Sequence, residues 1–202
     1  MSLVFYWHPQ SSASPIAAVL AELDLPHERI KIDIRSGEQH RPEFKALNPN
    51  AKVPTLVVDG APMFEGLAIQ LWLGEQYGVE RGLWPTAGTP ERLQAMSWSC
   101  WTYVSYGVLV QRLFVATQRE PDLRSEAHAA AARQELDALL TLLDQRLAGQ
   151  AWMLGEQYSL VDTVLASMMG FSAYIGAPVA AHAHVAAWLA KVQARPALQG
   201  EV

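Results

Sequence analysis

Cysteine is almost absent from this chain of 202 residues, which contains only Cys100. A single cysteine excludes an internal disulfide framework and any metal site built from several cysteines, and it is typical of a reducing compartment. His182 and His184 stand two apart in a predicted loop without a carboxylate cluster, so no metal site is predicted. Met1–Trp7 has neither the basic start nor the apolar core of a signal peptide, so we expect a cytoplasmic protein. No basic residue or helix start lies near Cys100 to lower its pKa, so we expect a buried, inert thiol.

Charged residues are also scarce. They make up 17% of the sequence, the net charge is −5, and lysine and arginine gather on no single segment. Without a basic cluster, nucleic acid is an unfavourable partner. Apolar residues make up 50%, which is typical of a folded chain with a substantial core.

The stretch 163–190 lacks Asp, Glu, Lys and Arg altogether and is long enough to span a membrane. Two glycines and Pro178 interrupt it, and serine and histidine side chains dilute it. We therefore predict no membrane segment, but a helix buried inside a helical domain.

The region from Asn48 to Gly66 carries the clearest pattern among the residues that are present. Asn-Pro at its start favours a turn, the β-branched run Thr55–Val58 favours a strand, and Asp59-Gly60 suits a two-residue hairpin connection. Pro54 cannot donate to a sheet ladder, so it belongs at the first residue of its strand or at an edge. A short second strand and a helix start are expected to follow.

The segments around this hairpin predict alternating strands and helices. Leu3–Trp7 has the apolar run of a fully buried strand, and the apolar residues of 16–23 recur at helical spacing. The three isoleucines of 30–34 alternate with charged residues, as in a half-buried strand. Short helices are expected at 42–47 and 67–78. The resulting order, βαβαββα, is that of the thioredoxin-like fold, with the first two strands parallel and the last two antiparallel.

The second part of the chain is predicted to be entirely helical. Residues 79–90, rich in glycine and proline, form a natural linker between a first domain at 1–78 and a helical domain at 91–202. The fold class is therefore α+β with two domains. Ser159 and Asp162 match a capping box that would begin a helix. The helices are expected at about 91–117, 125–148, 160–174 and 185–194.

The order Asn-Pro, Lys-Val-Pro-Thr-Leu, hairpin, acidic residue and Leu-Ala-Ile resembles the glutathione S-transferase family, which also has a Ser/Thr-x-x-Asp box in its helical domain. The turn at 8–14, His-Pro-Gln-Ser-Ser-Ala-Ser, is similar to the His-Pro-x-Ser-Thr-Ala-Thr turn of the phi class. The resemblance covers nearly the whole chain and points to cytosolic members with a serine-type first turn, as in the phi, theta and beta classes. It implies glutathione as co-substrate, no metal, and a homodimer.

The resemblance also implies which residues meet the thiol of glutathione. Ser11 would be the activating residue. A free thiol has a pKa of about 8.5, and a hydroxyl donor beside the amides of a helix start favours the thiolate. Ser12 is the alternative donor, and from the residues alone either serine could be a helix cap. Val53, before a cis Pro54, would pair its backbone with the cysteine of glutathione.

Five further residues are assigned by the same resemblance. Gln39, His40 and Lys52 would lie near the glycine carboxylate of glutathione, where a cation forms charge-assisted bonds. Glu65 matches the acidic residue that holds the γ-glutamyl end, and Gly66 stands where serine is usual. Glycine lacks that hydroxyl but keeps its amide at the start of the next helix.

The electrophile is expected in the cleft between the domains, lined by Trp7 or His8 on one side and by Trp101 and Tyr106 of the first long helix on the other. Tyr6, a rival hydroxyl donor, lies in mid-strand and is expected to pack in the core. We predict an enzyme of detoxification, a glutathione transferase that conjugates the thiolate with small apolar electrophiles. One alternative is a noncatalytic protein that keeps the fold for binding. The other is a glutathione-dependent thiol oxidoreductase or peroxidase, against which the lack of cysteine in the first turn argues.

Overall fold

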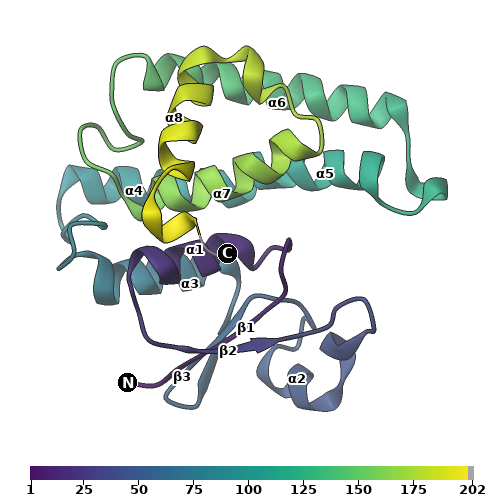
Figure 1. Cartoon of the computed structure of the whole chain (residues 1–202), viewed down its shortest axis with the longest axis vertical. Coiled ribbons are helices and arrows are strands. Elements are labelled where there is room, and N and C mark those ends of the chain that lie inside the picture. Colours follow the sequence, from purple (N-terminus) through teal and green to yellow (C-terminus); the bar gives the residue numbers. More distant parts are fainter. Residues whose placement is uncertain (200–202) are drawn as a thin grey trace.

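The computed structural model describes residues 1–199 and divides into a sheet with three helices and a second part made of helices alone (Figure 1). The strands are β1 (Leu3–Trp7), β2 (Glu28–Lys31), β3 (Thr55–Val58) and β4 (Ala61–Phe64). The helices of the first part are α1 (Ser14–Glu22), α2 (Pro42–Leu47) and α3 (Gly66–Leu73), which continues as a π turn (Gly74–Gly78).

The sheet has the strand order β2-β1-β3-β4. β1 is parallel to β2 and antiparallel to β3, which is antiparallel to β4, so the predicted parallel pair and hairpin are confirmed. Asp59 and Gly60 connect β3 to β4 with φ of 47° and 86°, the positive values that a tight hairpin turn requires. β2 ends before its predicted range does, but the Ile32 amide still donates to the Trp7 carbonyl at 2.8 Å. β1 is only partly buried, because its side chains alternate between the two faces of the sheet.

The second part contains the predicted helices, and the fold is thioredoxin-like followed by an all-helical part, as expected. The π turn Thr102–Tyr106 joins α4 to α5 without a break, so both lie within the single helix predicted at 91–117. Residues 200–202, the end of the predicted helical domain, lie outside the described residues. The helices are α4 (Pro90–Trp101), α5 (Gly107–Gln118), α6 (Glu126–Leu147), α7 (Leu160–Tyr174) and α8 (Ala183–Gln193).

Helix α7 lies inside the helical part, as predicted from its lack of charge: residues 160–166 are all buried. It begins with the expected capping box, in which the Ser159 amide donates to Asp162 Oδ2 at 3.0 Å. The other carboxylate oxygen, Oδ1, accepts from the Met153 amide at 2.8 Å and from the Trp188 indole at 2.9 Å. Asp162 therefore ties α7 both to the preceding loop and to α8. Among the helices of residues 1–199, none combines the length and apolarity needed to cross a membrane.

Helices α3 and α4 lie side by side in opposite directions and join the two parts of the chain. Gln70 of α3 donates to Ser99 Oγ of α4 at 2.9 Å. One turn toward the start of α3, Gly66 meets Tyr103, and in the other direction Glu75 pairs with Arg92. This register brings the π turn after α4 against the first residue of α3.

The segment after α8 packs against α1 (Figure 1). Arg195 donates to Glu22 through Nε at 2.6 Å and Nη2 at 2.7 Å, and the Tyr158 hydroxyl donates to the same carboxylate at 3.0 Å. The Glu22 side chain is only 3% exposed, so these bonds are largely shielded from water. They hold α1, which follows the first strand–helix turn, against the helical part.

The connection 79–90 between the two parts is packed rather than loose. Trp84 is 3% exposed, and its ring lies so close to Gly74 that a Cβ there would come within 2.6 Å of it. The carbonyl of Leu83 accepts from the Leu160 amide at 2.9 Å. The π turn that follows α3 therefore needs glycine where the tryptophan approaches.

Candidate functional site

The turn between β1 and α1 is held by Ser11. Its hydroxyl donates to the His8 carbonyl at 2.6 Å and accepts from the Ala13 amide at 3.1 Å. Ser11 is half-buried and lies in the turn just before α1, whose first amides favour negative charge. Its one proton is directed at His8, so donating to another acceptor requires the hydroxyl to turn away from that carbonyl.

Ser12 connects this turn to the segment before β3. Its Oγ donates to the Val53 carbonyl at 2.6 Å, although the two residues are 41 positions apart. The Val53–Pro54 peptide bond is cis, as the resemblance implied. Pro54 lies directly before β3, so the expected location of proline at the beginning of its strand is confirmed. The structure thus brings Ser11, Ser12 and Val53 together at one edge of the sheet.

A buried asparagine, Asn48, holds the loop that carries Lys52 through hydrogen bonds. Asn48 donates through Nδ2 to the Lys52 carbonyl at 2.7 Å and to Thr55 Oγ1 at 3.1 Å. The Lys52 side chain itself is exposed, next to the backbone of Val53. Its ammonium is therefore available to an anion that approaches this backbone.

Gln39 and His40 lie in the 3₁₀ turn after β2. Gln39 Nε2 donates to the Ile34 carbonyl at 3.3 Å, and His40 Nε2 lies 3.3 Å from the same amide nitrogen. Gln39 Oε1 is buried without a hydrogen bond to any described residue. His8 also faces this side, because its Nδ1 donates to the Ile32 carbonyl at 2.8 Å.

Glu65 and Gly66 form the start of α3. Glu65 is exposed, has φ of 72°, and makes no side-chain bond to the helix amides. A Cβ on Gly66 would lie 2.8 Å from Cε1 of Tyr103. A serine at this position would therefore collide with the tyrosine, and Gly66 is required here for packing as well as for a helix start.

The residues expected to line an electrophile cleft do not come together in this way. Tyr106 is 0% exposed and its hydroxyl lies 2.5 Å from Ser172 Oγ, so it belongs to the helical core, and the prediction that it lines a cleft is wrong. Trp101 stacks on it and faces a shallow hollow of about 500 Å³ on the outer side of α4. Trp7 is half-buried, with the Arg29 guanidinium 3.9 Å from its ring centroid.

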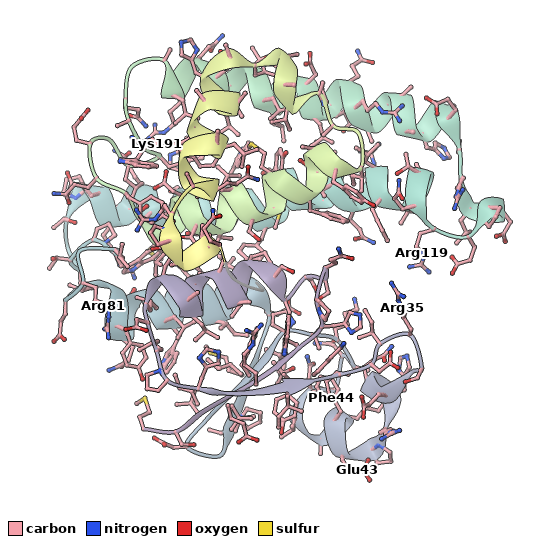
Figure 2. The ribbon with its side chains drawn as sticks, viewed as in Figure 1. Arg35, Glu43, Phe44, Arg81, Arg119 and Lys191 are labelled. Atoms are coloured by element: carbon pink, nitrogen blue, oxygen red, sulfur yellow. The ribbon has the colours of Figure 1, made fainter. Side chains whose placement is uncertain are left out.

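Two other aromatic residues, Tyr6 and Tyr103, are only partly buried. Tyr6 is half-buried and packs against the core from its surface, where it meets Phe44 edge-on with ring centroids 5.8 Å apart. Figure 2 shows Phe44 on α2. It faces a hollow of about 290 Å³ beneath α2. Tyr103 had no predicted role, yet it is the side chain that reaches the start of α3. The glycine in place of serine is the one sequence signal that could have pointed to it.

Cys100 is exposed, so the prediction of a buried thiol is wrong. The prediction rested on the lack of a basic residue or helix start nearby, but Cys100 lies on the outer side of α4 between Met96 and Val104. His182 and His184 each pair with a carboxylate of α6, Asp137 and Asp144, at 2.9 Å. Within residues 1–199 no group of three or more potential metal ligands occurs.

Comparison with known proteins agrees with this geometry. Residues 12–76 match the family model of the glutathione S-transferase N-terminal domain, and residues 109–196 match that of the C-terminal domain. Glutathione S-transferase 3 of Zea mays is 31% identical over 198 residues, which cover 93% of this chain and 86% of the maize protein. The chain belongs to the glutathione S-transferase family.

Other relatives of this chain carry names that refer to different activities or ligands. The disulfide-bond oxidoreductase YfcG of Escherichia coli is 28% identical over 200 residues, covering 95% of this chain and 90% of that protein. A glutathione transferase of Burkholderia graminis, solved with two glutathione molecules per subunit, has a TM-score of 0.85 at 28% identity and covers 98% of this chain and 85% of its own.

Proposed function

We propose that this family member is a glutathione transferase that binds glutathione along the first turn, Val53 and the start of α3, and conjugates its thiolate with small apolar electrophiles. The bond from Ser12 to the Val53 carbonyl supports this most directly, because it places the first turn beside backbone that can pair with a peptide. Catalysis would then consist of thiol activation and positioning.

Ser11 is the proposed activating residue. When the Ser11 hydroxyl turns away from the His8 carbonyl toward the sulfur of glutathione, it donates a hydrogen bond to the thiolate. The amides at the start of α1 add a favourable field for the negative charge. Both effects lower the pKa of the bound thiol.

The ends of glutathione are assigned by charge. The exposed ammonium of Lys52, with Gln39 and His40, suits the glycine carboxylate. The exposed carboxylate of Glu65 suits the γ-glutamyl ammonium group. Trp7 and His8 remain proposed neighbours of the electrophile.

Variants of the two serines test the mechanism. Ser11→Ala should lower the ultraviolet absorbance of bound thiolate at pH 7 while the circular dichroism stays unchanged. Ser12→Ala is the matched control, which should weaken glutathione affinity by loosening Val53 but leave the thiol pKa unchanged. If Ser12→Ala raises that pKa and Ser11→Ala does not, Ser12 is the donor. If neither variant raises it, this turn does not activate the thiol.

Retention on glutathione resin and turnover of a chloronitrobenzene separate the enzyme from a noncatalytic member of the family. Retention without turnover would favour the binding protein. The names of the E. coli and B. graminis relatives favour a second candidate, the reduction of a small disulfide by two glutathione molecules. In that reaction one thiolate attacks the disulfide and expels a thiolate, and the second glutathione displaces the other half, leaving glutathione disulfide. Assay of a small dialkyl disulfide with glutathione measures it directly.

We also propose that the chain pairs with a second copy. One face of the α4–α5 helix exposes apolar side chains, with exposed fractions of 68% for Leu93, 44% for Met96, 59% for Val104 and 52% for Val108. Apolar stripes of this kind are typical of interfaces between proteins. A monomeric mass in analytical ultracentrifugation would contradict the proposal.

A further inference from the structure

The hydroxyl of Tyr103 is buried and makes no hydrogen bond with any residue that the structure describes. Burial raises the pKa of this phenol, so the group is neutral and has a proton to donate. A buried hydroxyl without a partner lowers stability compared with a phenylalanine at the same place. The presence of a tyrosine hydroxyl here, rather than a phenylalanine, is therefore explained if a ligand supplies the acceptor.

The position of this hydroxyl coincides with the start of α3. The oxygen lies 3.1 Å from the point that a Cβ on Gly66 would occupy. The ring edge and hydroxyl of Tyr103 therefore lie against the space that a serine side chain at this position would need. Tyr103 as a whole residue is only partly buried, so this place lies close to the surface.

The surroundings favour a carboxylate. Glu65, the residue before α3, does not cap the helix with its side chain. The amides of the first turn and the positive end of the helix dipole therefore remain suited to an anion from outside. The unpaired Tyr103 hydroxyl adds a neutral donor to the same place.

The local backbone is unusual at this residue. Tyr103 lies in the π turn Thr102–Tyr106, which replaces one α-helical turn within the continuous α4–α5 helix. From this turn Tyr103 faces α3, while Tyr106 faces Ser172 of α7. Single π turns inside α-helices frequently mark functional sites.

We infer that Tyr103 is a specificity-determining residue for glutathione. Its hydroxyl donates to the α-carboxylate of the γ-glutamyl residue, where the serine usual in the family is replaced by Gly66. The inference rests on the proposed function, because it assumes that glutathione lies with its γ-glutamyl end at α3.

Titration calorimetry with two ligands tests it. The first ligand is glutathione, and the second is 4-aminobutyryl-Cys-Gly, which differs from it by lacking that carboxylate. Tyr103→Phe should bind glutathione about tenfold more weakly than the wild type, as expected for a lost bond to a charged group. It should bind the analogue as the wild type does, and its unfolding temperature should be equal or higher.

Tyr106→Phe is the matched control in the same π turn. It loses the bond to Ser172 and should be less stable, but it should bind both ligands as the wild type does. If the wild type binds glutathione and Tyr103→Phe binds it equally well, or weakens both ligands equally, the inference is wrong while the proposed function stands. If the wild type does not bind glutathione at all, the proposed function fails, and this inference fails with it.

Discussion

Removal of the Asp162 side chain should cost much stability, because its buried carboxylate accepts hydrogen bonds from four donors. They are the Ser159 amide and hydroxyl, the Met153 amide and the Trp188 indole, all at 2.8–3.0 Å. Asp162 is 0% exposed, so water cannot replace the lost acceptor without rearrangement. A helix cap alone is worth about 1 kcal/mol.

Asp162→Ala should therefore cost far more than a cap. The serine hydroxyl can rotate to another acceptor, but the two amides and the indole are fixed by the backbone and the core. Each buried donor left unpaired costs about 1–3 kcal/mol, and such costs are not fully additive, so we expect a loss of about 3–5 kcal/mol. Asp162→Asn keeps one oxygen for Met153 and Trp188 but turns an NH₂ group toward the Ser159 amide. Its loss should be about 1–3 kcal/mol.

Urea denaturation followed by circular dichroism measures these free energies by linear extrapolation. Asp137→Ala is a matched control, because its side chain is 55% exposed and, within residues 1–199, pairs only with His182. It should change stability by less than about 1 kcal/mol. An Asp162→Ala variant within about 1 kcal/mol of the wild type would refute the reasoning and reduce Asp162 to an ordinary cap.

Two further predictions follow from packing and charge. Gly74→Ala should destabilise the protein by about 1–3 kcal/mol, because its Cβ would lie 2.6 Å from the buried Trp84 ring. Gly149→Ala is the control and should be tolerated, because no described atom lies within 4 Å of its Cβ. Equal thermal midpoints of the two variants would contradict this prediction. The pKa of Asp144 is lowered by its bond to His184 and by two α8 amides, so its stabilising effect should be present near neutral pH and be lost as pH falls through that lowered pKa. The stability difference between wild type and Asp144→Asn should accordingly shrink in acid, and a difference that stays constant down to about pH 2 would contradict the assignment.

The sequence by itself determined the elements whose causes are local. Asp59-Gly60 predicts its hairpin because only a few residue types accept positive φ at both positions. Ser159 and Asp162 predict the start of α7 because both members of the capping box lie three residues apart on one chain segment. Helix ranges in the second part followed from periodicity for the same reason.

The roles of individual aromatic residues depend on which neighbouring element each face of a helix contacts. The periodicity of the sequence does not determine those contacts. The π turn after α4 shifts this face, so Tyr106 lies in the core and Tyr103 reaches α3. Burial of Cys100 was predicted because no neighbour in the sequence would lower its pKa, but in the structure it lies with Met96 and Val104 on an outer stripe that the rest of residues 1–199 does not cover.

The candidate site shows the same division. The motif around Val53 and Pro54 is contiguous, so the sequence alone could indicate it. The bond from Ser12 to Val53 joins two distant segments of the first part, and the contact of Tyr103 with Gly66 joins the first part to the second. Both pairs are far apart in the chain, and only the tertiary structure brings them together. Such contacts depend on side-chain volume and on the register of α3 against α4, which are properties of the tertiary structure and leave no local pattern in the sequence.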